Sequence, residues 1–178
     1  FLFGYPARIK KDNKRGAGRF DTGAFAVWRR RKRGESYEAV QRVFAALDGG
    51  STQQEVAERA IQIAKLNHAE LMFGHVVDSV PDSLTGTDYK ELAETVRNRL
   101  VDSLGDTLKA AEEDPDIPSV EVVVKVGRIQ ETIHNLMIKP FEPELVICGE
   151  RGLSNITYVF VGSVSTYLIR NLRCDVLL

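Results

Sequence analysis

Cysteine and long apolar runs are scarce in this chain. Its two cysteines, Cys148 and Cys174, form no CxxC pair and no metal-binding spacing, and each stands at the edge of an apolar run, as buried reduced thiols do. No apolar stretch approaches the roughly 20 residues that a membrane span needs. The N-terminal charges are not followed by the apolar core of a secretory signal. We therefore expect a cytoplasmic chain without a membrane partner.

The common catalytic motifs are also absent. The sequence has no GxxxxGK[ST] P-loop, no GxGxxG after its first predicted strand, no GxSxG elbow and no HExxH metal motif. Its three histidines are scattered, and His75 falls within a buried strand pattern. A satisfied core or strand-end residue is a better interpretation of His75 than a catalyst. The sequence offers candidates for binding but no catalytic set, so we expect no enzyme, or at most weak turnover.

Charge is balanced over the whole chain but not along it. Residues 1–35 hold 11 Lys and Arg against 3 Asp and Glu, a net +8, whereas residues 36–178 hold 13 against 22, a net −9. No helical or strand period persists in the basic part. We expect residues 1–36 to form a basic, disordered extension and residues 37–178 to form one domain. A basic arm that contacts nucleic acid is the alternative, which we do not expect but leave open.

Strand and helix patterns alternate from residue 43 onward. Short apolar or β-branched runs, typical of strands buried in a parallel sheet, are separated by helical periodicities. This order predicts an α/β fold, a five-stranded parallel sheet with helices on both faces. The predicted strands cover residues 43–47, 71–77, 120–126, 145–148 and 174–178.

Glycines recur in a distinctive spacing after the fourth predicted strand. The pattern is Gly149-x2-Gly152-x9-Gly162-Ser163, and a helical pattern follows it. Glycines let a ligand approach the backbone, and a helix start supplies unpaired N–H groups with a positive dipole end. The spacing therefore predicts a phosphate site, although Ser163 on its own could be an ordinary N-cap.

A carboxylate follows the first predicted strand directly. Asp48 could accept hydrogen bonds from ribose hydroxyls or an exocyclic amine, or it could be an ordinary turn residue before Gly49 and Gly50. Ligands of parallel α/β sheets bind at the carboxyl ends of the strands. We therefore expect the ends of the first and fourth predicted strands to form one site.

With these motifs the chain resembles the universal stress proteins, whose ATP-binding subgroup carries G-x2-G-x9-G-[ST]. The resemblance covers residues 37–178 and includes Ala45-Ala46-Leu47-Asp48-Gly49-Gly50-Ser51, His75-Val76-Val77 and Cys174-Asp175-Val176. It implies a regulatory protein of the stress response that binds ATP, ADP or AMP, with Mg²⁺ as an optional companion, and a homodimer through the last strand. A nucleotide-independent dimeric interaction protein and a slow ATPase are the alternatives.

The resemblance also implies site residues. Asp48 would hold the adenosine end of the nucleotide, the glycine-rich loop would wrap its ribose and phosphates, and Arg151 would pair with phosphate. Leu153 stands where the family often has a basic residue. The full set of implied binding residues is Ala46, Leu47, Asp48, Val76, Cys148, Gly149, Arg151, Gly152, Gly162, Ser163, Val164 and Ser165.

Overall fold

Five parallel strands form the centre of the computed structural model, which describes residues 10–11, 17–19, 26–28, 40–78, 86–149 and 162–178. Their order across the sheet is β8-β7-β4-β5-β6, and every neighbouring pair among them is parallel. This confirms the predicted five-stranded parallel sheet. The strands are β4 (Arg42–Ala46), β5 (Glu70–Val77), β6 (Val120–Val126), β7 (Leu145–Cys148) and β8 (Asp175–Leu177).

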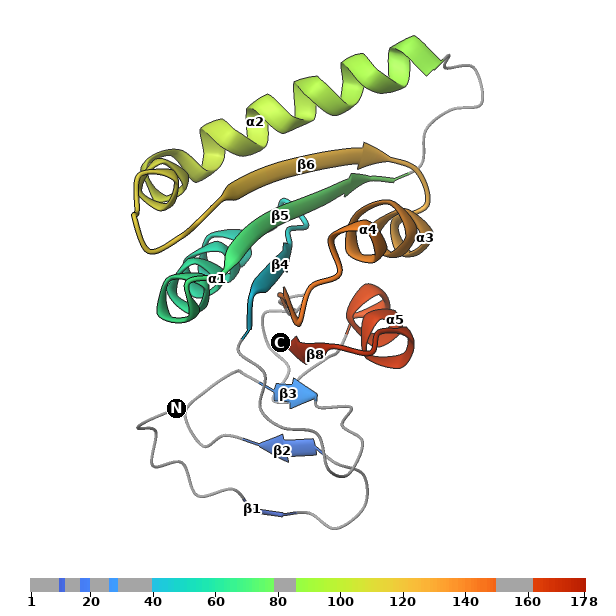
Figure 1. Cartoon of the computed structure of the whole chain (residues 1–178). Helices are drawn as coiled ribbons and strands as arrows, with labels where there is room; N and C mark the ends of the chain where they lie inside the picture. The colour runs from blue at the N-terminus through green and yellow to red at the C-terminus, as the bar shows by residue number, and fades with distance from the viewer. Residues whose placement is uncertain (1–9, 12–16, 20–25, 29–39, 79–85, 150–161) are drawn as a thin grey trace.

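Helices cover both faces of this sheet, as predicted (Figure 1). On one face lie α1 (Gln53–Asn67) and α2 (Gly86–Glu112). On the other lie α3 (Ile129–Ile133), the π-helix η1 (His134–Ile138), α4 (Lys139–Phe141) and α5 (Ser163–Asn171). Within the described residues, no helix is both long enough and apolar enough to cross a membrane.

Two apolar cores result, one on each face of the sheet. In what we call the first core, Val43, Ala45 and Phe73 are completely buried together with alanines of α1 and leucines of α2. In the second core, Phe44 and Val146 pack with side chains of η1 and α5. Successive residues of β4 enter opposite cores because side chains alternate along a strand. The continuous apolar runs that predicted the strands have this cause.

The helix expected after β6 is continuous in sequence but not in geometry. It passes from α3 through a π-helical turn into α4, which has Pro140 in its first turn. Pro140 lacks the N–H that would bond four residues back, so a helix can only begin around it rather than continue unchanged. Pro140 therefore lies in the first turn of α4, where its missing N–H is tolerated.

Three short strands extend the sheet beyond β8. They are β1 (Lys10–Lys11), β2 (Ala17–Arg19) and β3 (Ala26–Trp28), and they pair in antiparallel fashion below β8 in Figure 1. β3 pairs with β8 through Val27 with Leu177 and Trp28 with Val176. These strands were not predicted from the sequence. The disorder predicted for the rest of residues 1–36 lies outside the described residues.

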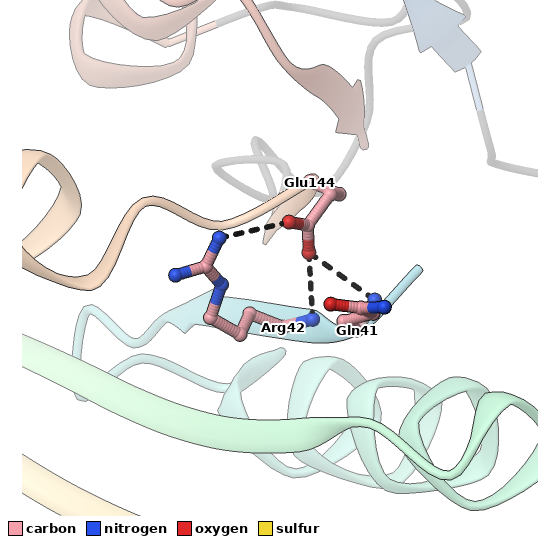
Figure 2. Close-up of polar contacts among 3 residues, drawn as sticks. All are labelled: Gln41, Arg42 and Glu144. Atoms are coloured by element: carbon pink, nitrogen blue, oxygen red, sulfur yellow. Dashed lines mark hydrogen bonds and ion pairs between the residues drawn. The ribbon is translucent and has the colours of Figure 1, made fainter. Parts of the chain in front are cut away.

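One carboxylate joins the amino ends of two central strands. Glu144 precedes β7, and its Oε2 accepts hydrogen bonds from the backbone N–H groups of Gln41 (3.2 Å) and Arg42 (2.7 Å), as Figure 2 shows. Its Oε1 pairs with the Arg42 guanidinium at 3.0 Å. The backbone N–H of Glu144 donates in turn to the Arg42 carbonyl at 3.1 Å. These contacts fix β4 against β7, whose opposite ends form the site described below.

Candidate functional site

The site lies where the direction of the strand order reverses. From β4 the chain builds outward through β5 and β6, then returns to place β7 on the other side of β4. Connections leave these two neighbouring strands in opposite directions, so a crevice opens at their carboxyl ends. Ala46 and Cys148 are register partners at that edge, and both line a pocket there.

The turn after β4 forms one side of the pocket. Asp48 is exposed, and its Oδ1 accepts a hydrogen bond from the Gly50 N–H at 2.8 Å. Gly49 has φ +77°, a backbone conformation that favours glycine. The turn role weighed for Asp48 is therefore present in the structure. Among the described residues that line the pocket, Asp48 is the only charged one.

Gly149 brings the end of β7 close to the start of α1. A Cβ at this position would lie 2.8 Å from Thr52 Oγ1 and 3.2 Å from Val56 Cγ2. The first of these separations is shorter than real Cβ contacts show, so a side chain here would push α1 away. Glycine at position 149 therefore allows the end of β7, which lines the pocket, to approach the start of α1 closely.

The start of α5 forms the opposite wall and carries N–H groups that have no acceptor within the helix. Its first helical hydrogen bond runs from Thr166 N–H to the Gly162 carbonyl at 2.8 Å. The N–H groups of Ser163, Val164 and Ser165 therefore have no acceptor within the helix. No side chain at the N-cap position, which Gly162 occupies, caps them. All three residues line the pocket, which makes this wall suited to an anion.

A buried thiol lies between these walls. Desolvation by burial raises the pKa of Cys148 to about 11, and a hydrogen bond from the Ser165 side chain partly opposes this rise. The neutral thiol predominates at physiological pH, so Cys148 is a poor nucleophile. Its chemistry in the pocket is that of a small apolar surface.

Two pocket residues were missed by the sequence analysis. Ile129 and Ile133, from α3, line the pocket beside Val76. In the sequence, their four-residue spacing is that of an ordinary apolar helix face. The available signal was their position, because α3 begins just after Gly127, at the carboxyl edge of β6 where the other site residues gather.

Most of the predicted binding residues come together in this one pocket. Arg151 and Gly152 lie outside the described residues. Among the described residues, no group of three His, Cys, Asp or Glu side chains could hold a metal ion. The predicted residues that line the pocket are Ala46, Leu47, Asp48, Val76, Cys148, Gly149, Gly162, Ser163, Val164 and Ser165.

Comparisons with known proteins agree with this architecture. The model of the universal stress protein family matches residues 39–178. Universal stress protein Sll1388 of Synechocystis sp. is 30% identical over 148 residues, which cover 77% of this chain and 96% of the relative. The solved structure of UspA from Lactobacillus plantarum has a TM-score of 0.62 at 20% identity, over 79% of this chain and 97% of its own. A universal stress protein solved in complex with cAMP has a TM-score of 0.56 at 24% identity, over 78% and 95%.

The parallel sheet with helices on both faces is thus shared with solved relatives. This chain belongs to the universal stress protein family. The family resemblance inferred from the glycine spacing is confirmed. Membership of its ATP-binding subgroup stays a prediction.

Proposed function

We propose that this protein binds an adenine nucleotide in the pocket between β4 and β7 and acts as a regulatory protein of a stress response, with little or no turnover. The ligand would be ATP, ADP or AMP, with Mg²⁺ accompanying the triphosphate. The observation that carries the proposal is the start of α5, where three consecutive N–H groups without a helical acceptor belong to the pocket wall. Phosphate oxygens would accept from them.

The remaining walls suit the other parts of a nucleotide. Ile129, Ile133 and Val76 offer an apolar surface for a purine base, and Asp48 offers a carboxylate oxygen to ribose or to the exocyclic amine. Arg151 and Gly152 belong to the same proposal, since both stand within the glycine-rich segment. The relative solved with cAMP shows a nucleotide in complex with this fold, which supports the choice of ligand class.

Isothermal titration with ATP, AMP and cAMP tests the proposal directly. We expect ATP or AMP to bind, and we expect ATP hydrolysis to remain below roughly 1 s⁻¹, the lower edge of ordinary enzyme rates. Absence of binding by all three nucleotides would contradict the proposed function. Faster hydrolysis would mean that the protein is an enzyme and not only a nucleotide-binding protein.

Two variants of Asp48 separate its turn role from its ligand role. Asn keeps the acceptor for the Gly50 N–H but loses the charge, whereas Ala loses both. We expect Asp48→Asn to weaken ATP and adenosine binding by roughly 10-fold, because a hydrogen bond to an ionised group contributes about 1.5–3 kcal/mol. Asp48→Ala should weaken both further. An Asn variant that binds both ligands like the wild type would leave Asp48 with the turn role alone.

A homodimer through the last strand is also part of the proposal. The outer edge of β8 pairs with β3 through two register positions. A second copy adding its own β8 there would have to take the place of β3. Light scattering on the full chain measures this directly, since a dimer has about twice the 19.9 kDa of the single chain. A mass that stays at one chain across concentrations would contradict the dimer.

A further inference from the structure

His75, on β5, contacts the turn that contains Asp48 from the side away from the pocket. Its Nδ1 lies 2.8 Å from the Leu47 carbonyl oxygen. The Leu47 N–H donates to the Gly74 carbonyl, also at 2.8 Å, so both polar backbone groups of Leu47 are bound to β5. The ladder between β4 and β5 ends at the pair of Ala46 with Gly74. The ring of His75 therefore adds a link beyond the end of the ladder, where the chain turns into the pocket wall.

The ring acts from the face of the sheet opposite to the pocket's apolar wall. Phe73, two residues before His75 on β5, belongs to the first core, whereas Val76 belongs to the second core and lines the pocket. Alternation along the strand places His75 on the side of Phe73. A Cβ built on Gly49 would lie 3.9 Å from His75 Cε1, so the ring lies near the left-handed residue of the turn. His75 is not among the residues that line the pocket.

The hydrogen of the contact between His75 and Leu47 can be assigned to one atom. A carbonyl oxygen only accepts, so Nδ1 must carry the hydrogen. The neutral ring then has its free lone pair on Nε2, and protonation adds a hydrogen at Nε2 without removing the one at Nδ1. The hydrogen bond to Leu47 exists in both states of the ring.

We propose that His75 is a positioning residue of the nucleotide site: its Nδ1–H fixes the Leu47 carbonyl, and thereby the orientation of Asp48, without touching the ligand. The inference deepens the proposed function and depends on it for its binding test. Asp48 follows directly after Leu47, whose carbonyl is fixed, and directly precedes Gly49, which lies near the ring. Freedom in this turn would lower the fraction of molecules whose carboxylate is in place, and the apparent affinity falls with that fraction.

Two substitutions of similar bulk distinguish positioning from packing. His75→Asn places an amide N–H where Nδ1 stands, and His75→Leu fills the space without a donor. Titration with ATP should show roughly 3- to 10-fold weaker binding for the Leu variant, the range of one net hydrogen bond. The Asn variant should bind within about twofold of the wild type. Equal losses in both variants, or no loss in the Leu variant, would overturn the proposal.

Hydrogen exchange of the ligand-free protein keeps this test separate from the proposed function. The amides of Gly49 and Gly50 should exchange faster in the Leu variant than in the wild type, and the Asn variant should resemble the wild type. Faster exchange in a protein that binds no nucleotide would support the link from His75 to the turn and contradict the function. Unchanged exchange in the Leu variant would overturn the role of His75 itself.

Discussion

Replacing Gly162 with aspartate is expected to lower the affinity for ATP by roughly 30- to 100-fold while leaving the fold as stable as before or more so. Gly162 is the N-cap of α5 and has φ −63° and ψ 167°, extended values that any residue adopts. An Asp side chain there would accept the N–H groups at the start of α5 and place a negative charge where phosphate is proposed to bind. Loss of one or two charge-assisted hydrogen bonds accounts for the size of the effect.

Adenosine provides the matched ligand control for this variant. It lacks phosphate, so its affinity should be the same for the wild type and for Gly162→Asp in isothermal titration. The thermal midpoint should stay level or rise, because an N-cap Asp and its charge at a helix N-terminus each contribute a few tenths to about 1 kcal/mol. Equal losses for ATP and adenosine would mean that the start of α5 does not receive the phosphates.

The second large effect concerns folding. Gly74→Ala is expected to reduce the free energy of unfolding by about 3 kcal/mol, at the upper end of ordinary overpacking costs. A Cβ on Gly74 would lie 2.3 Å from Phe44 Cζ and 3.0 Å from Met137 Sδ. Phe44 is completely buried in the second core, so its ring has no free space to move into. Thermal unfolding should shift down by roughly 6–12 °C, taking about 2–4 °C per kcal/mol for a chain of this size.

Gly86→Ala is the control for the chemical change itself. Among the described residues, no atom lies within 4 Å of a Cβ built on Gly86, at the start of α2. This variant should unfold within about 1 kcal/mol of the wild type. The double variant Gly74→Ala with Phe44→Leu should recover part of the loss, because a smaller side chain opens the space. If Gly74→Ala and Gly86→Ala had the same thermal unfolding midpoint, the second core would have accommodated the added methyl group without loss of stability, which would contradict the prediction.

The central strands were predictable because a strand that is buried on both faces has a continuous run of apolar residues. β6 and β7 have the predicted bounds. All four residues of β7 are buried and alternate between the two cores, whereas β6 is marked by its β-branched valines. β1, β2 and β3 are two or three residues long, too short for any periodicity to register. The π-helical turn of η1 likewise leaves an ordinary helical pattern of apolar residues.

Site residues that directly follow a strand could be predicted from the sequence. Residues that reach the site through packing or through a hydrogen bond from a neighbouring element could not. Asp48 and Gly149 stand directly after β4 and β7, so topology alone brings them together. Ile133 reaches the pocket only because α3 packs over the sheet, which no local pattern reveals. His75 was interpreted as a satisfied strand-end residue, and its hydrogen bond agrees. What the sequence could not show is that its partner is the carbonyl before Asp48.

The two cores give this fold two regions with different tolerance of sequence change. The pocket takes its apolar wall from the second core. Among the described residues, it is linked to the side of α1 and α2 through Leu47, through the hydrogen bond of His75 to the Leu47 carbonyl, and through the close approach of Gly149 to the start of α1. Interiors accept many apolar substitutions if volume and patterning are kept. The α2 face can therefore drift among apolar residues without reshaping the ligand's surroundings. Changes around α3 and α5 alter the pocket and the packing together, so that face is where relatives with different ligands should diverge.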